Sequence, residues 1–194
     1  MSTVTIITIA AVVLIGIVTL VALIAIYVGM TYNSLVKKRN SVEESFSTMD
    51  VYLKKRWDLI PNLVATVKGY AKHEAETLEK VIAARNGNYY SMSEEEKLEA
   101  NKQLSKGIAS INVVVERYPE LKANENFMNL NNQLQRTEDE IANARKYYNA
   151  IVKEYNNKVD MFPSSIVASL FKFKRKQMFL VDDASERQAV KVEF

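Results

Sequence analysis

The amino-acid sequence predicts an all-α protein: an N-terminal transmembrane helix, a long antiparallel four-helix bundle, and a short amphipathic, basic C-terminal segment. Two observations lead to this fold class. The stretch Thr5–Met30 is apolar and contains no charged residue, and the rest of the chain repeats apolar residues every three or four positions, as amphipathic helices do. We expect three parts: the transmembrane helix (1–31), the bundle (32–162), and the C-terminal segment with its tail (163–194).

The stretch Thr5–Met30 is long enough to cross a bilayer. A helix rises ~1.5 Å per residue, so it spans roughly 39 Å and crosses a ~30 Å hydrocarbon core with tilt. A cleaved signal peptide is the alternative, but such peptides have a basic start and a shorter apolar region. Because Met1–Val4 carry no charged side chain, a permanent anchor is favoured.

Positive residues that follow the apolar stretch indicate its orientation. These residues are Lys37, Lys38 and Arg39. Positive residues beside a span tend to stay in the cytoplasm, which favours an external N-terminus and a cytoplasmic bundle.

Beyond Tyr32 the sequence predicts a first bundle helix that continues the transmembrane helix. Its apolar stripe is Leu35, Val42, Phe46, Met49, Leu53 and Ile60. Arg39 and Arg56 occupy stripe positions where apolar residues are expected. A residue before proline is biased away from helical angles, so we expect a kink or reversal near Asp58–Pro61.

Two further helices are expected before Pro119. One covers residues 62–85 and stops where Gly87 can adopt the left-handed conformation that ends many helices. The Ser93-x-x-Glu96 pattern is a capping box that starts the next helix, and Pro119 ends that helix.

The fourth helix has the most regular pattern. Its stripe alternates steps of three and four through Phe127, Leu130, Leu134, Thr137, Ile141, Ala144, Tyr148, Ile151 and Tyr155. Asn124 is a suitable N-cap, and Pro163 closes the helix. The helix is rich in Asn, which is unfavourable for helix propensity. These Asn residues either bridge neighbouring helices or subunits and fix their register, or lie on a solvated face.

The segment after this helix has the composition of a membrane-surface element. An antiparallel fourth helix of ~38 residues covers roughly 57 Å and returns toward the bilayer. Ser164–Phe179 combines apolar and positive residues, which suits an anionic leaflet. The candidate lipid-interface residues are Phe171, Lys172, Phe173, Lys174, Arg175 and Lys176. This context favours lipid over nucleic acid. Leu180–Phe194 is interpreted as a tail or an edge that docks on a neighbour.

Four stretches of the sequence resemble the LemA family of bacterial membrane proteins. They are VYLKKRWDLIPNLVATVKGYAKHEAETLEKVIAAR (Val51–Arg85), YPELKANENF (Tyr118–Phe127), IANARKYYNAIVKEYN (Ile141–Asn156) and FPSSIVASLF (Phe162–Phe171). The resemblance covers residue 35 to the C-terminus, together with the apolar stretch. It implies a single-pass protein of the bacterial inner membrane with a helical-bundle domain, and it does not imply an enzyme. One departure is Glu44-Ser45-Phe46, where the family commonly has Trp.

A group of charged residues before Pro61 is the first candidate for a partner surface. The residues are Asp50, Lys54, Lys55, Arg56 and Asp58. The resemblance is densest here. The alternative is a set of i,i+4 pairs, such as Asp50 with Lys54, that supports the turn.

The sequence does not point to a catalytic, metal or cofactor site. The chain has 0 Cys and 1 His, so it lacks thiol ligands and a multi-histidine site. An HExxH motif that starts at His73 would need a second His at position 77, where the chain has Thr77. The acidic run Glu94–Glu96 suits the first turn of a helix, where the helix dipole favours negative charge.

Together these features predict a non-enzymatic, membrane-anchored structural or scaffold protein. The expected partners are the lipid bilayer, further copies of the chain as a homo-oligomer, and other membrane proteins. Ala25-x-x-x-Gly29 is a small-residue pair of the kind found where membrane helices touch. The alternative is a sensor or adaptor that couples an envelope signal to cytoplasmic partners. A hydrolase or other enzyme is disfavoured because no set of residues passes a geometric checklist for catalysis.

Overall fold

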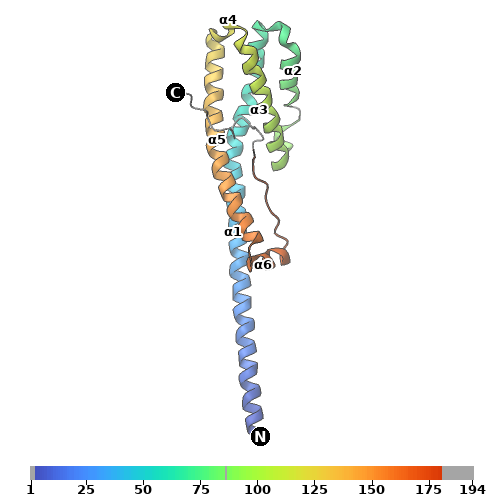
Figure 1. Ribbon diagram of the computed structural model, residues 1–194, viewed down its shortest axis with the longest axis vertical. Coiled ribbons are helices and arrows are strands. Elements are labelled where there is room, and N and C mark those ends of the chain that lie inside the picture. Colours follow the sequence, from blue (N-terminus) through green and yellow to red (C-terminus); the bar gives the residue numbers. More distant parts are fainter. Residues whose placement is uncertain (1–2, 86, 181–194) are drawn as a thin grey trace, which may run out of the picture. The chain divides into compact units, whose positions relative to one another are not determined.

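The computed structural model describes residues 3–85 and 87–180, and every regular element within them is helical (Figure 1). This confirms the all-α fold class. The described parts of the chain form two compact units: unit 1 from Met1–Glu43 and Ile151–Lys176, and unit 2 from Glu44–Ala150 and Gln177–Phe194. The predicted division at residues 31/32 and 162/163 stays a prediction. Residues 181–194, most of the predicted tail, lie outside the described residues.

The first helix, α1, is one continuous helix of 68 residues, Thr3–Tyr70. The reversal expected near Asp58–Pro61 is therefore wrong, because Pro61 lies inside α1, whereas the alternative of a kink stays a prediction. Proline inside a helix removes one hydrogen bond and costs ~3 kcal/mol. Burial outweighs that cost, since each fully buried aliphatic side chain contributes about 1.5–3 kcal/mol. The residues around the proline that are at most 3% exposed are Trp57, Ile60, Leu63, Val64 and Val67.

The segment expected as the second helix is thus divided. Its first part belongs to α1, and a short 3-10 helix, Lys72–Glu74, leads into α2, Ala75–Ala83. Gly87 has φ +104°, in the left-handed region, as predicted.

Unit 2 packs α1 from residue 44 onward with α2, α3 (Glu94–Glu116), the short α4 (Pro119–Lys122) and the first part of α5 (Glu125–Asp160) (Figure 1). The capping box is confirmed: the Glu96 N–H donates to Ser93 Oγ at 3.2 Å, and the Ser93 N–H donates to Glu96 Oε2 at 2.7 Å. Asn124 is also confirmed as the N-cap of α5, because its Oδ1 accepts the Phe127 N–H at 2.9 Å. Pro119 begins α4 rather than ending α3.

The core of unit 2 follows the predicted stripes. Its buried side chains include Phe46, Met49, Leu53, Leu78, Leu104, Ile108, Ile111, Phe127, Leu134, Ile141 and Tyr148. Helices α2 and α3 approach closely at Gly107, where an added Cβ would lie 3.2 Å from Val81 Cγ2. The apolar surface removed from water is the main stabilising contribution to such a bundle.

Unit 1 combines the beginning of α1, the end of α5, and α6, Ser164–Leu170. From Ile7 to Met30 every side chain of α1 is exposed except that of Val28, which is half-buried. Among the described residues, α1 is the helix that is long and apolar enough to cross a membrane. The buried side chains of unit 1 are Thr31, Leu35, Val42, Val152, Tyr155, Asn156, Ser164, Val167 and Ala168.

The end of α6 turns the chain back toward α5. Lys172 adopts a left-handed conformation with φ 59°. The Phe173 N–H donates to the Ala168 carbonyl at 2.9 Å, and the Lys172 N–H donates to the Ser169 carbonyl at 3.2 Å. These two bonds form a Schellman motif, which satisfies the last carbonyls of the helix. The residues that follow can then run back along α5 in an extended conformation.

Candidate functional site

The structure removes Arg56 from the residues predicted as a partner surface. Arg56 is 1% exposed and lies inside unit 2. Asp50 and Lys54 are half-buried, whereas Lys55 and Asp58 are exposed. Arg56 therefore does not belong to the surface, whereas Asp50, Lys54 and Asp58 are linked to one another through Tyr89 and the Lys54–Asp58 ion pair.

Arg56 is the centre of a buried polar cluster. Its Nη1 donates to both carboxylate oxygens of Glu138 and to Ser105 Oγ, each at 3.0 Å. Its Nη2 donates to the backbone carbonyl and to Oδ1 of Asn101, each at 2.9 Å. Arg56 Nε has no hydrogen-bond partner. A guanidinium is held inside a helical bundle only when such partners compensate for its lost hydration.

Asp50 and Lys54 both contact Tyr89, and Lys54 Nζ lies 5.9 Å from the centroid of the Tyr89 ring. Asp50 accepts hydrogen bonds from the Tyr89 hydroxyl and from Lys97 Nζ, both at 2.6 Å. Burial, followed by the bond to Asp50, raises the pKa of Tyr89 far above its ordinary value, so this phenol stays neutral. The i,i+4 ion pair that forms is Lys54–Asp58 rather than Asp50–Lys54.

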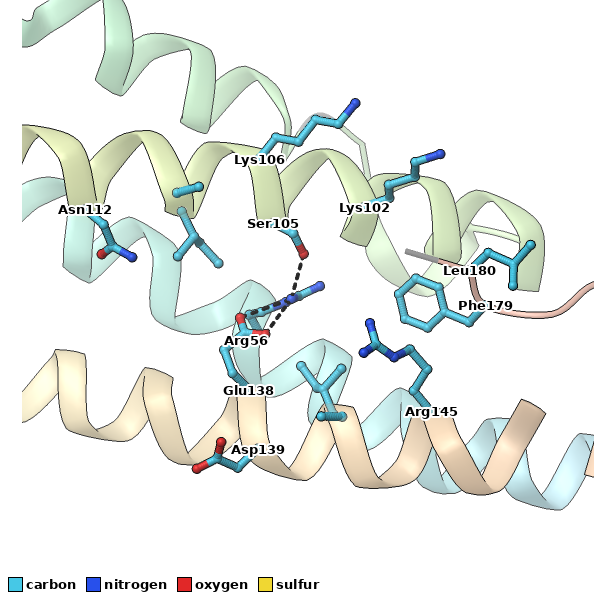
Figure 2. Close-up of a pocket in the computed structure, with 14 residues that line it drawn as sticks. Arg56, Lys102, Ser105, Lys106, Asn112, Glu138, Asp139, Arg145, Phe179 and Leu180 are labelled. Carbon is cyan, nitrogen blue, oxygen red and sulfur yellow. Dashed lines mark hydrogen bonds and ion pairs between the residues drawn. The ribbon is translucent and has the colours of Figure 1, made fainter. Parts of the chain in front are cut away.

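Beside this cluster, a cleft of about 640 Å³ opens between α3 and α5 (Figure 2). Figure 2 shows Arg56 at its base, bonded to Ser105 and Glu138. Apolar, basic and acidic side chains line the cleft, and the acidic ones are Glu138 and Asp139. The apolar and basic ones include Ile108, Ile141, Phe179, Leu180, Lys102, Lys106 and Arg145.

The hydrogen bonds around the cleft do not prepare Ser105 for nucleophilic chemistry. Its hydroxyl accepts a hydrogen bond from Arg56 and donates to the Asn101 carbonyl at 3.1 Å. A serine nucleophile instead requires a neighbouring base that takes its proton. The hydrogen bonds of Ser105 are therefore those of a structural residue rather than of a nucleophile.

The last described residues of unit 2 are held on α5 by side chains that bind their backbone. The Tyr148 hydroxyl donates to the Gln177 carbonyl at 2.8 Å. Asn149 binds Phe179 at two points, accepting its N–H at 2.8 Å and donating to its carbonyl at 2.9 Å. Burial, with smaller effects of Glu94 and Glu95, raises the pKa of Tyr148 to about 12.

Unit 1 contains the same pair of residue types, seven positions later on α5. The Tyr155 hydroxyl donates to the Lys174 carbonyl at 2.9 Å. Asn156 binds both the N–H and the carbonyl of Lys176, each at 2.9 Å. These Asn side chains therefore hold an extended segment, which neither interpretation of the Asn-rich helix anticipated. The Asn residues of α5 that lie exposed are Asn126, Asn129, Asn131, Asn132, Asn143 and Asn157.

The predicted lipid-interface residues all lie in unit 1, with different surroundings. The centroid of the Tyr32 ring lies 4.8 Å from that of the Phe171 ring and 5.7 Å from that of the Phe173 ring. Arg39 lies over the Phe173 ring at 5.7 Å. Arg175 pairs with Asp160. Lys172 and Lys174 are exposed, and Lys176 is half-buried.

The remaining sequence features have structural roles or lie at the surface. His73 is exposed, in the 3-10 helix Lys72–Glu74. The Ser93 N–H holds the pKa of the Glu96 carboxyl below its usual range. Within the described parts of the chain, no group of three or more His, Cys, Asp and Glu side chains could hold a metal ion.

Sequence reasoning identified Arg56 as an unusual residue but missed its partner Glu138. It also missed the clamps on the extended segment. Their signal was present as two Tyr-Asn pairs, Tyr148-Asn149 and Tyr155-Asn156, spaced by two helical turns.

Comparisons with known proteins agree with this architecture. A model described as "LemA family" matches residues 45–194. The chain is 26% identical to Protein LemA of Metamycoplasma hominis over 169 residues, which cover 87% of this chain and 75% of that protein. It is 23% identical to magnetosome protein MamQ 2 of Paramagnetospirillum magneticum and 22% identical to magnetosome protein MamQ of Magnetospirillum gryphiswaldense. Both alignments cover 77% of this chain and 65% of the magnetosome protein, so the chain spans less than two thirds of the length of those relatives.

Proposed function

Because this chain belongs to the LemA family, we propose that it is a non-enzymatic scaffold that self-associates in the membrane through its N-terminal helix. The chain is a membrane-associated helical protein. The scaffold role goes beyond membrane association, and one observation supports it most strongly. The apolar part of α1 between Ile7 and Met30 is exposed, and it leads without a break into a packed helical unit.

One face of this apolar segment suits contact with a second helix. Ala22, Ala25 and Gly29 lie within about 60° of one another around a helix with 3.6 residues per turn. Small residues at such spacings let membrane helices approach closely. A Cβ added at Gly29 would meet nothing within 4 Å in this chain. The face is therefore open to a neighbouring copy.

A single-cysteine scan tests self-association, because the chain contains 0 Cys and needs no background substitutions. Full-length variants with one Cys at each position from 15 to 29 would be oxidised in native membranes and the dimer yield measured. We expect maxima at Ala22→Cys, Ala25→Cys and Gly29→Cys, and minima at Leu20→Cys and Ile24→Cys on the opposite face. A yield that is uniformly low, or that lacks helical periodicity, contradicts the proposal.

We also propose that the helix lies in the inner membrane with the N-terminus outside and unit 2 in the cytoplasm. Lys37, Lys38 and Arg39 support this orientation. A variant with Val113→Cys carries its thiol on α3 at a side chain that is 64% exposed. In intact cells this thiol should resist a membrane-impermeant maleimide and react after lysis. Labelling of intact cells would reverse the proposed orientation.

Of the five residues of the candidate partner surface, two are exposed, Lys55 and Asp58. Arg56 and Asp50 make contacts inside unit 2. Lys54, which pairs with Asp58, lies 5.0 Å from the centroid of the 81%-exposed Tyr90 ring. We propose that an acidic segment of another membrane protein binds here. Charge reversal by Lys55→Glu should abolish that binding, and the exposed cation Lys146 supplies the matched control Lys146→Glu. Equal effects of the two variants would argue against this surface.

A sensor or adaptor is the second candidate, and the continuity of α1 favours it. An unbroken helix can carry a shift of its membrane segment toward the bundle. The fluorescence emission of Trp57, the single Trp of the chain, would then change when the protein is reconstituted into bilayers of different thickness. A Gly-Gly insertion after Met30 should remove that response. A wild-type protein whose emission is insensitive to thickness does not act in this way.

A further inference from the structure

Helix α6 presents an apolar face that the described residues leave uncovered. Ile166 and Leu170, four residues apart on α6, are 61% and 69% exposed, and Phe162, in the turn that precedes α6, is 81% exposed. The opposite side of α6 is buried through Val167 and Ala168, which are 3% and 1% exposed. The short helix is thus held by one face while its more apolar face points outward. Such an exposed set of large apolar side chains indicates an interaction site.

The location of α6 within unit 1 indicates what covers this face. Phe171 directly follows α6, and its ring lies 4.8 Å from that of Tyr32 on α1. Tyr32 is two residues beyond Met30, the end of the apolar segment, which corresponds to ~3 Å along the helix. A polar headgroup layer is about 5–8 Å thick on each side of the hydrocarbon core. A membrane that surrounds the apolar segment therefore brings its headgroup layer to the level of Phe171.

The charges beside α6 fit the same environment. Lys172 and Lys174 are exposed and follow α6 directly. Lys38, on the neighbouring stretch of α1, pairs with Glu154 at 2.9 Å. An apolar face flanked by exposed lysines is the arrangement of segments that lie in the plane of an anionic membrane surface.

We propose that α6, together with the turn before it, is a second membrane contact, which inserts Ile166 and Leu170 of the helix and Phe162 of the turn into the headgroup–acyl boundary of the bilayer that holds α1. This refines the contact expected from the sequence. The Phe173 ring packs between Tyr32 and Arg39, so the inserted side chains precede Phe171, and Lys172 and Lys174 bind the lipid headgroups. The inference rests on the proposed anchoring of α1.

Fluorescent labels on single cysteines test this contact in the full-length chain. The environment-sensitive label would be attached to Ile166→Cys or Leu170→Cys in vesicles of phosphatidylcholine and phosphatidylglycerol. Ile15→Cys, in the apolar segment, is the control for a lipid environment. Val113→Cys, 64% exposed on α3 in unit 2, is the matched control for water. Each label is then quenched either with spin-labelled lipid or with aqueous iodide.

We expect spin-labelled lipid to quench the labels at positions 166 and 170. Compared with the label at position 113, their emission should be shifted to the blue and their quenching by iodide should be several-fold weaker. Omitting phosphatidylglycerol, or substituting Lys172→Gln and Lys174→Gln, should reduce lipid quenching at position 166. If iodide quenches the labels at 166 and 170 as strongly as the label at 113, the proposal is overturned. Protection of these labels from both quenchers also overturns it, because it indicates that a protein covers α6. If the Ile15 label also escapes lipid quenching, the proposed anchor itself is wrong.

Discussion

The buried ion pair between Arg56 and Glu138 allows a quantitative test of how unit 2 is held together. Arg56 is 1% exposed, and the side chain of Glu138 is 33% exposed. The substitution Glu138→Gln keeps the shape of the acceptor but removes the charge that compensates the guanidinium. The bonds from Arg56 to Asn101 and Ser105 remain.

The expected magnitude follows from these contacts. Removing one partner of a fully buried ion pair costs ~3–5 kcal/mol, because the other charge stays buried without compensation. Solvent access to Glu138 and the remaining acceptors around Arg56 reduce this cost, so we expect a loss of about 2 kcal/mol. The double substitution Arg56→Met with Glu138→Leu removes both charges. It should lie within about 1 kcal/mol of the wild type, since an apolar replacement avoids the desolvation cost.

Trp57 provides the assay, because the 1 Trp of the chain is 3% exposed and lies in unit 2. Urea unfolding of the full-length protein in a mild nonionic detergent, followed by Trp57 fluorescence, reports the free energy of unfolding of this unit. Asp139→Asn, at the exposed neighbour of Glu138, is the matched control and should change stability by less than about 0.5 kcal/mol. If Glu138→Gln behaves like this control, or if the double variant is no more stable than Glu138→Gln, the reasoning is refuted.

Three further predictions use the same unfolding measurement. Burial raises the pKa of Tyr148 from 10.0 to about 12, so its neutral phenol contributes stability that is fully present below pH 10 and is lost as the pH rises toward 12. Tyr148→Phe should therefore flatten the pH dependence of the free energy of unfolding between pH 10 and 12, and an unchanged slope would contradict the assignment. Pro61→Ala should restore a hydrogen bond inside α1 and raise the free energy of unfolding by about 1–3 kcal/mol; a loss of stability would mean that the packing around Pro61 requires the proline. Ser93→Ala should remove the capping box of α3 and cost ~1 kcal/mol, whereas Ser110→Ala, an exposed mid-helix position, is the control and should cost less than about 0.5 kcal/mol.

Features that depend on neighbouring residues could be predicted from the sequence. The apolar segment, the helical stripes, the Ser93 capping box and the Asn124 cap all agree with the structure. Each depends on side chains within a few positions along the chain, so the local pattern contains the necessary information.

Features that depend on distant residues could not be predicted in this way. Local preference favoured a kink or a reversal at Pro61, and burial of apolar side chains on both sides of it keeps α1 continuous instead of reversing the chain. Burial also removed Arg56 from the candidate partner surface. The sequence shows a run of charges, but it does not show that Arg56 meets Glu138, a residue 82 positions away.

The sequence by itself determined that this protein is helical and carries one apolar segment able to cross a membrane, because hydropathy and helical periodicity are properties of contiguous residues. Only the tertiary structure decided which polar groups become buried partners and which apolar residues stay exposed. Asn149 and Asn156 hold an extended backbone segment, and Phe162, Ile166 and Leu170 remain uncovered. These outcomes depend on how segments that are far apart in the chain pack together, which local pattern does not encode.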